Sequence, residues 1–207
     1  LVDEKVEVDF MVNNGDKVKK GEMIGKVKGT AKSLLAGERV ALNFLQHLSG
    51  IATKTSFYVA MVEGLKVKIV DTRKTTPNLR ILEKEAVRHG GGVNHRFSLD
   101  DGILIKDNHI KGAGGIGKAI TAARRNAPHT LKIEVEVSNL EGVREALAYE
   151  ADIIMLDNMD YEGIKEGVNI IGDRALIEAS GNMADKNIRG IAELGVNIIS
   201  IGSLTNS

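Results

Sequence analysis

Cationic and imidazole side chains gather between Asp71 and Lys111, in a stretch rich in Gly, Thr, Asn and Asp. Five of them are the candidates for a site: Arg73, Lys74, His95, Arg96 and Lys106. A guanidinium matches a carboxylate or a phosphate at two points, whereas an ammonium acts as a compact point charge. Most arginines and lysines are solvated surface groups, but these lie beside apolar runs and turn glycines rather than four residues apart on a helix face. The stretch therefore predicts a binding site for a ligand with more than one anionic group.

The overall composition limits the size of that ligand. Lys plus Arg number 28, as do Asp plus Glu, which argues against a nucleic-acid-binding protein that relies on bulk positive charge. Aromatic residues make up only 3%, too few for a platform on which bases stack. Cysteine is absent, which excludes disulfides and thiolate catalysis and fits a reducing cytoplasm. With neither a signal peptide nor an apolar run that spans a bilayer, we expect a soluble, cytoplasmic protein that binds a small ligand.

Strand-like runs alternate with helical segments after residue 64 and must position these side chains. We expect strands at 66–71, 102–106, 131–137, 152–156, 174–180 and 196–202. Thr76 followed by Pro77 predicts a helix N-cap with proline at the first helical position, and Ser138 to Glu141 predicts a capping box. Strands that alternate with helices pair in parallel through right-handed crossovers, so the fold belongs to the α/β class.

Polar residues follow nearly every predicted strand, and this distinguishes a barrel from an open sheet. They include Asp71, Lys106, Glu136, Asp157, Ser180, Gly181 and Gly202. An open sheet concentrates its site at one switch point, whereas a barrel takes ligands from nearly every strand end. We therefore expect a parallel (β/α) barrel of about six strands over residues 65–207. Glu134 and Glu136 share one face of their strand, and if its apolar face meets the helices, both carboxylates point inward and require cationic or metal partners.

Two segments precede the barrel. Residues 1–30 alternate apolar and polar side chains around Asn-Gly and Gly turn signals, which predicts a hairpin in a small, here incomplete, β-rich domain. Residues 31–64 show helical spacing interrupted at Gly37 and Gly50, and we expect linking helices. Because the chain starts inside a strand pattern and ends just after one, we expect it to be shorter than the natural protein. The glycine runs at 89–92 and 112–115 fit either backbone anion sites or simple turns.

Several motifs carry a family resemblance, which runs from about Gly37 to the last residue. The motifs DTRKT, RHGGGVNHR and IKDNH, followed by KIEVEV, IMLDN, EASGN and IGSLTNS, resemble the nicotinate-nucleotide pyrophosphorylases, also called quinolinate phosphoribosyltransferases. The resemblance implies a Mg²⁺-dependent pentosyltransferase of de novo NAD biosynthesis. Such an enzyme moves the phosphoribosyl group of phosphoribosyl pyrophosphate to quinolinate with decarboxylation, giving nicotinate mononucleotide, pyrophosphate and CO2. It also implies that residues 1–30 are the remnant of an N-terminal α/β sandwich domain.

The resemblance also implies roles for individual residues. The positions that match quinolinate-binding ones are Arg39, Arg73, His95, Arg96 and Lys106. Those around the phosphoribosyl group are Lys74, Glu136, Asp157, Ser180, Gly181 and Gly202. Lys74, Lys106, Glu136 and Asp157 are the implied catalytic residues, with the two carboxylates meeting Mg²⁺ through the pyrophosphate. Arg39 is implied to reach the neighbour's site in a homodimer or higher oligomer.

The chain departs from the family pattern at two positions. Asn206 stands where family members often carry His, and Asn182 follows Ser180 and Gly181 where a second Gly is more usual. Two other functions stay open. A related phosphoribosyltransferase acting on nicotinate or another anionic ring would not need so many cations facing one ring. A non-catalytic anion-binding paralogue would keep the barrel, but the intact set of cations and carboxylates speaks against it.

Overall fold

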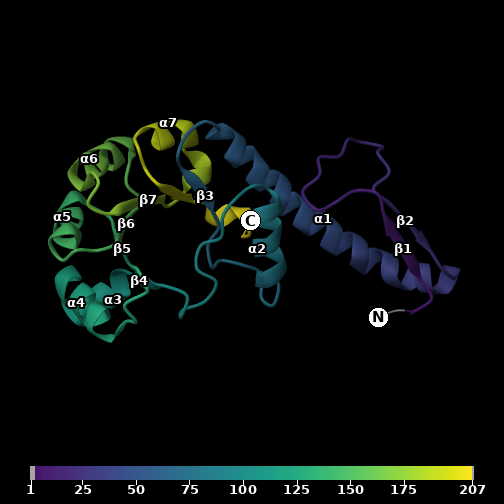
Figure 1. Cartoon of the computed structure of the whole chain (residues 1–207), viewed down its shortest axis with the longest axis horizontal. Helices are drawn as coiled ribbons and strands as arrows, with labels where there is room; N and C mark the ends of the chain where they lie inside the picture. Colours follow the sequence, from purple (N-terminus) through teal and green to yellow (C-terminus); the bar gives the residue numbers. More distant parts are fainter. Residues whose placement is uncertain (1–2, 207) are drawn as a thin grey trace.

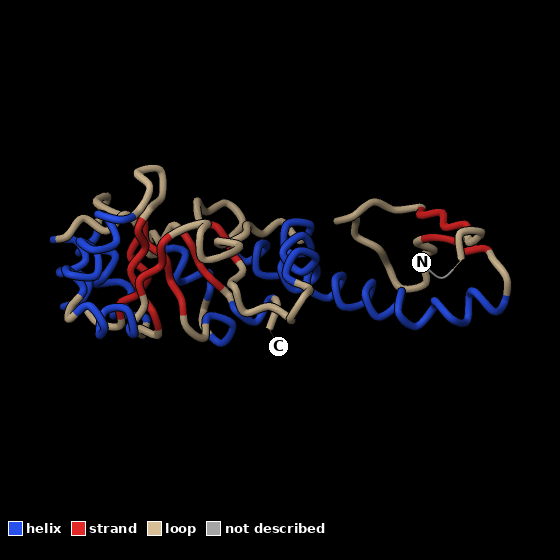
Figure 2. Tube along the Cα trace, turned by 90° about the horizontal axis from the view of Figure 1, so that it is seen from below, coloured by secondary structure: helices blue, strands red, loops and turns tan. Residues whose placement is uncertain are grey.

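The computed structural model describes residues 3–206. A β-hairpin lies at one end of the molecule and an α/β body at the other, and helix α1 (Ala31–Met61) joins them (Figure 1). Figure 2 shows this helix running along the long axis from the hairpin to the body. None of the helices in residues 3–206 combines the length and the apolar character needed to cross a membrane.

The predicted hairpin is present. β1 (Glu7–Phe10) pairs antiparallel with β2 (Gly25–Lys28), with Glu7 opposite Lys28. The turn glycines do not join the strands directly, because residues 11–24 form a longer loop between them. Gly15 and Gly21 adopt φ values of 89° and 83°, a backbone region that glycine enters without steric cost. The glycine turns therefore shape the loop rather than the strand pairing.

Helix α1 is one continuous helix, where the sequence predicted separate linking helices. It starts at the N-cap Thr30, whose side chain accepts the Ser33 N–H, and it continues through Gly37 and Gly50. A glycine costs a helix only about 1 kcal/mol relative to alanine and keeps its N–H donor, so it does not by itself end one. Ile51, Thr55 and Tyr58 are buried in the second half of the helix. That half packs against α2 (Arg80–His89), β3 (Lys68–Val70) and α7 (Ile188–Glu193) of the body.

All six predicted strands form; five are shorter than their predicted runs, and the strand predicted at 152–156 keeps its length but lies one residue later. They are β3 (Lys68–Val70), β4 (Ile103–Ile105), β5 (Ile133–Val137), β6 (Ile153–Asp157), β7 (Leu176–Ser180) and β8 (Ile198–Ser200). The six strands pair in parallel in the order β3-β8-β7-β6-β5-β4. The edge strands β3 and β4 follow each other along the chain, which is the strand order of a (β/α) barrel with one unpaired seam. Val93 lies at this seam and forms a single parallel bridge with Val70. The predicted α/β class and its parallel sheet are confirmed.

Helices cover the outer face of the curved sheet (Figure 1). Besides α1, these are α2 (Arg80–His89), α3 (Asp107–Ala113), α4 (Ile116–Asn126), α5 (Leu140–Ala148), α6 (Tyr161–Ile171) and α7 (Ile188–Glu193). Two short 3-10 turns, η1 (Met183–Asp185) and η2 (Gly202–Leu204), lie instead at the carboxyl ends of β7 and β8. Two predicted helix starts were wrong. Helix α2 begins at Arg80 and not after Thr76, because Asn78 has a φ of 65°, which no α-helix accommodates. Helix α5 is capped by Asn139, whose side chain accepts the Gly142 N–H at 2.8 Å, in place of Ser138.

The strand alternation confirms which side chains face inward. Val135 and Val137 of β5 are buried in the core, and Val137 lies beside Gly142 of helix α5. Glu136 lines the inner pocket instead, and Glu134 shares its face by the two-residue period of a strand. The acidic face of β5 therefore points into the barrel, as predicted.

The two glycine runs serve packing and turns. A Cβ atom on Gly90 would lie 2.6 Å from Thr55 Cβ, and one on Gly92 would lie 2.7 Å from Thr55 Cγ2. Glycine therefore allows α2 and the following loop to approach α1. In the second run, Gly114 ends α3 with a φ of 80°, the left-handed conformation common after helices.

Candidate active site

A pocket of about 820 Å³ lies at the carboxyl ends of the strands. Every predicted site residue except Arg39 lines it: Arg73, Lys74, His95, Arg96, Lys106, Glu136, Asp157, Ser180, Gly181 and Gly202. The order of the strands explains this convergence, because parallel strands present their carboxyl ends at the same edge of a barrel. Arg39 instead lies exposed in the first half of α1, and it is absent from the lining of this pocket.

The loop that carries Arg73 and Lys74 is held from outside the pocket. Arg80 Nη2 donates to the Arg73 carbonyl at 3.1 Å, and Thr205 Oγ1 donates to the Lys74 carbonyl at 2.8 Å. Arg73 Nε is buried and has no hydrogen-bond partner within residues 3–206. Because a buried donor without a partner is costly, this N–H is a group that an anionic ligand would satisfy.

A buried ion pair fixes the segment that carries His95 and Arg96. Asp71, fully buried at the end of β3, accepts hydrogen bonds from Lys84 Nζ at 2.6 Å, Asn94 Nδ2 at 2.7 Å and the His95 N–H at 2.8 Å. A buried carboxylate is stable only when it is paired and hydrogen-bonded in this way. Removing one partner would leave a buried charge, so the network ties the 94–96 segment to β3.

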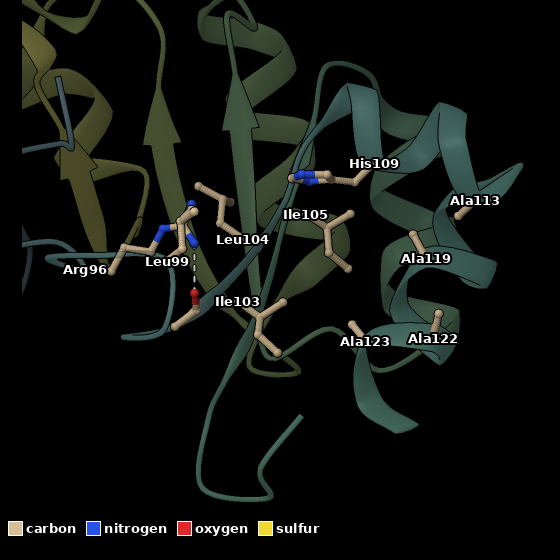
Figure 3. Close-up of a pocket in the computed structure, with 11 residues that line it drawn as sticks. Arg96, Leu99, Ile103, Leu104, Ile105, His109, Ala113, Ala119, Ala122 and Ala123 are labelled. Atoms are coloured by element: carbon tan, nitrogen blue, oxygen red, sulfur yellow. Dashed lines mark hydrogen bonds between the residues drawn. The ribbon is translucent and has the colours of Figure 1, made fainter. Parts of the chain in front are cut away.

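Two guanidiniums lie close together in the pocket. Arg96 Nη1 donates to the Gly102 carbonyl at 2.8 Å (Figure 3). Burial lowers the pKa of Arg96, the positive charge of Arg73 lowers it further, and Glu134 opposes both effects. Two like charges that influence each other in a partly buried site cost free energy. The pair therefore favours a ligand that brings more than one negative charge.

Figure 3 also shows a second cavity, of about 470 Å³, between β4 and helices α3 and α4. Leucine, isoleucine and alanine side chains line most of it, including Ile103, Ile105 and Ala119. Among the described residues 3–206, Arg96 and His109 are the only titratable ones that line it. This cavity lacks the opposed charges of the larger pocket, so we place the candidate active site in the larger one.

A further cation of the pocket pairs with a carboxylate across the sheet. Lys106 Nζ lies 2.6 Å from Glu136 Oε2, which confirms the cationic partner predicted for this inward glutamate. The backbone N–H of Lys106 donates to His109 Nδ1 at 2.9 Å. On the next strand, Asp157 Oδ2 accepts from Asn158 Nδ2 at 2.7 Å. The two carboxylates therefore sit on neighbouring strands and face the same pocket.

The turn after β7 explains one of the two departures from the family pattern. Gly181 has a φ of 84°, and a Cβ atom on it would overlap the Asn158 side chain. Asn182 also has a positive φ, of 50°, a conformation that asparagine adopts more readily than most residues. Asn182 and Asn206 both line the pocket. The asparagine at 182 thus keeps the turn while adding a side chain to the pocket wall.

Sequence reasoning did not identify a buried cluster next to these cations. His95 Nε2 lies 3.3 Å from Glu134 Oε2 and 3.5 Å from Glu178 Oε2. Burial lowers the pKa of His95, but the hydrogen bonds and charges of Glu134 and Glu178 outweigh it and raise the pKa to about 10. Burial raises the pKa of Glu134 to about 7, against the influence of His95. The available signal was the presence of glutamates inside two strands whose other residues are mostly apolar.

The geometry agrees with comparisons to known proteins. Residues 1–49 match the family model described as "Quinolinate phosphoribosyl transferase, N-terminal domain", and residues 51–207 match "Quinolinate phosphoribosyl transferase, C-terminal domain". This chain belongs to the quinolinate phosphoribosyl transferase family. The N-terminal match extends the predicted resemblance to the first residue.

Family relatives are similar over nearly all of the chain. The chain is 47% identical to a probable nicotinate-nucleotide pyrophosphorylase [carboxylating] of Bacillus subtilis, over all of its own length and 72% of the relative. It is also 47% identical to the protein of the same name from Synechocystis, over 97% of this chain and 69% of that one. A crystal structure of a NadC deletion mutant matches with a TM-score of 0.94 and 48% identity, over 99% of this chain and 72% of that chain.

Proposed function

We propose that this protein transfers the phosphoribosyl group of phosphoribosyl pyrophosphate to quinolinate and releases the 2-carboxylate as CO2. The products are nicotinate mononucleotide, pyrophosphate and CO2, which makes the protein a pentosyltransferase of NAD biosynthesis. The observation that carries the proposal is the strand-end pocket, where Arg73, Arg96 and Lys106 face Glu136 and Asp157. A dicarboxylate and a diphosphorylated sugar repel each other, so holding them side by side requires several fixed cations.

The quinolinate end of the pocket is built from Arg73, Arg96 and Lys106. A guanidinium pairs with a carboxylate in a bidentate manner, and Arg73 has a buried N–H still without a partner. Nicotinate, with one carboxylate, would leave one of the closely spaced guanidiniums unsatisfied. A site built for two carboxylates rejects such an analogue because its own buried polar groups stay unpaired. His95 also lines the pocket.

The phosphoribosyl end is built from residues on the other strands. Lys74, Glu136, Asp157, Ser180, Gly181 and Gly202 line it. As the bond between ribose C1 and pyrophosphate breaks, the ribose gains oxocarbenium character, which the two carboxylates stabilise, while Lys74 offsets the charge of the leaving group. The quinolinate nitrogen attacks C1 and becomes quaternary. The bond from C2 to its carboxylate then breaks, its electron pair stays on C2 beside the positive nitrogen, and a proton from solvent replaces the CO2.

The donor set of the pocket fits Mg²⁺ held together with substrate. Mg²⁺ prefers oxygen ligands and commonly takes one or two protein carboxylates plus waters and phosphate oxygens, and Glu136 and Asp157 both face the pocket. Within residues 3–206, neither belongs to a group of three or more His, Asp or Glu close enough to enclose an ion. When bound, the ion would supply positive charge to the departing pyrophosphate.

We further propose a homodimer in which Arg39 completes the partner's pocket. Arg39 lies outside the pocket of its own chain, on the half of α1 that leaves the body. The same half exposes Leu35, Val40 and Phe44, with 76% of Leu35 accessible, and an apolar helix face of this kind is normally covered. A two-fold pair places the same helix on both pockets. Each site would then receive one more guanidinium for quinolinate.

A coupled assay of the full-length protein tests the proposed function. Phosphoribosyl pyrophosphate and Mg²⁺ are supplied with quinolinate or with nicotinate, and pyrophosphate and CO2 are both measured. We expect quinolinate-dependent release of both products and loss of turnover when the Mg²⁺ is chelated. Equal or faster turnover of nicotinate would indicate a phosphoribosyltransferase for another ring. Quinolinate binding without turnover would indicate an anion-binding paralogue.

A further inference from the structure

Arg80, at the start of helix α2, reaches two segments that carry side chains of the strand-end pocket. Its Nη2 donates to the Arg73 carbonyl at 3.1 Å, and its Nη1 donates to the Phe97 carbonyl at 3.2 Å. Its Nε donates to Thr75 Oγ1 at 3.0 Å. One guanidinium therefore joins the loop that carries Arg73 to the segment that carries Arg96.

The contacts of Arg80 are those of a spacer. All three acceptors are neutral oxygens, so these hydrogen bonds neutralise no carboxylate. The Cζ atom also lies 6.0 Å from the centre of the Phe97 ring, within the range of a cation–π contact. Arg80 is not among the described residues that line the strand-end pocket. Because a planar guanidinium presents its donors at fixed angles, the two carbonyls that it binds are held at a fixed separation.

The separation of these two segments decides how the pocket meets its ligand. Burial and the positive charge of Arg73 lower the pKa of Arg96, so the two guanidiniums stand within reach of each other. Arg96 Nη1 is held at the Gly102 carbonyl, whereas the buried Nε of Arg73 has no partner within residues 3–206. Two carboxylates on adjacent ring atoms meet both guanidiniums only when these stand at the matching distance, and a single carboxylate needs only one of them.

We propose that Arg80 is a positioning residue that sets the spacing of Arg73 and Arg96, and thereby the preference of the pocket for two adjacent carboxylates over one. The identity of the ligand as quinolinate rests on the proposed function, whereas the preference for two carboxylates rests on the two guanidiniums. Arg80 acts through the backbone and does not touch the ligand. A lysine cannot replace it, because an ammonium is a single point charge on a flexible stem.

Other anchors keep both segments folded when Arg80 is replaced. Thr205 Oγ1 donates to the Lys74 carbonyl at 2.8 Å, which holds the loop after β3. The buried Asp71 network ties the segment that carries Arg96 to the end of β3. Arg80 differs from these anchors because it bonds to both segments beside their arginines. Its loss should therefore change the spacing of the two guanidiniums while the barrel stays folded.

Ligands with two carboxylates and with one test the proposal on Arg80→Lys. Calorimetric titration of the full-length protein measures dissociation constants for quinolinate and nicotinate, and for phthalate and benzoate, which lack the ring nitrogen. We expect Arg80→Lys to weaken quinolinate and phthalate binding about tenfold, and to change nicotinate and benzoate binding by less than about twofold. The KM for quinolinate should rise in proportion, while kcat stays within about threefold, because Glu136 and Asp157 lie on β5 and β6.

Three results would overturn the proposal. Equal weakening of all four ligands would show that Arg80 only supports the fold, and four unchanged affinities would show that the spacing does not depend on Arg80. A wild type that binds phthalate no more tightly than benzoate would show that the two guanidiniums do not favour two carboxylates. Failure of the proposed function would appear separately, as absent turnover of quinolinate by a wild type that still prefers phthalate to benzoate.

Two further variants complete the test. Arg88→Lys is the matched control, since Arg88 lies on the same helix and donates to Glu85 at 3.2 Å on the surface; it should leave all four affinities unchanged. Thr75→Val keeps the shape of the side chain and removes one acceptor of Arg80, which covers the case in which Arg80→Lys does not fold. We expect Thr75→Val to weaken phthalate binding about threefold with benzoate unaffected, and an equal effect on the two ligands, or no effect, would overturn the proposal.

Discussion

Replacing Glu136 with glutamine tests the division of labour in the pocket. The substitution keeps the size of the side chain and removes its charge. Glu136 Oε2 lies 2.6 Å from Lys106 Nζ in the free protein, so the variant also releases a cation that we assign to quinolinate. We therefore expect two separate effects, a lower kcat and a quinolinate affinity that stays equal or increases. Asp157→Asn on the neighbouring strand should lower kcat in the same way.

The expected changes in kcat and in stability follow from the charges involved and from their exposure to solvent. Two unit charges about 4 Å apart interact by about 4 kcal/mol near a protein surface. The transition state carries only a partial charge, and glutamine keeps a dipole, so the variant loses only part of this interaction energy. A third of it, roughly 1.4 kcal/mol, is the smallest loss of transition-state stabilisation that we expect, and it corresponds to a tenfold lower kcat. The folded state should lose less than about 1 kcal/mol, because Lys106 exposes 47% of its side chain.

Steady-state kinetics, calorimetric titration with quinolinate and thermal unfolding measure these three quantities on the same protein. Glu141→Gln serves as the matched control, since Glu141 lies in the first turn of α5 and outside the pocket. A variant that keeps its full kcat would refute the electrostatic role of Glu136. A fall in kcat accompanied by an equal loss of quinolinate affinity would show a general loss of the site instead.

Three further predictions concern the dimer, the helix packing and the buried cluster. Arg39→Ala and Lys106→Ala proteins should each be nearly inactive alone. After subunit exchange the mixture should recover roughly a quarter of wild-type activity, because half of the dimers are mixed and one of the two sites in each mixed dimer is intact. No recovery despite demonstrated exchange would show that Arg39 does not act in the partner's site. Gly90→Ala should lower the free energy of unfolding by about 1–3 kcal/mol through overpacking against α1, and an unchanged urea midpoint would contradict that close approach. The pKa of His95 rises from 6.5 to about 10 on folding. Protonated His95 therefore stabilises the fold fully below pH 6.5, and this contribution is lost as the pH rises through 10. Between these pH values the melting temperature should fall more steeply for the wild type than for His95→Asn, and parallel curves would contradict the raised pKa.

Local patterns in the sequence were sufficient for the strands and for the edge of the sheet that carries the site. A strand reveals itself through alternation and short apolar runs, and all six expected strands form. Because parallel strands end at a common edge, polar residues directly after them could be assigned to one pocket. Lys106, Asp157 and Gly202 are far apart in the chain and line the same pocket for this reason.

Helix boundaries were less predictable, since they depend on single backbone conformations. Thr76 and Pro77 carry a strong start signal, yet the positive φ of Asn78 delays α2 to Arg80. Gly37 and Gly50 suggested breaks in α1, which the structure does not show. The burial of the second half of α1 against the body outweighs the small cost of its glycines.

The sequence by itself determined the class of the fold, the strands and the residue types at their ends, because these follow from periodicities that act over a few neighbouring residues. Only the tertiary structure decided which charges pair. Lys84 meets Asp71 from a different element, and His95 meets Glu134 and Glu178 only because the curved sheet brings β5 and β7 to the segment between α2 and β4. Burial and charge pairing are set by neighbours distant in sequence, so the pKa shifts of the site could be read only from the tertiary structure.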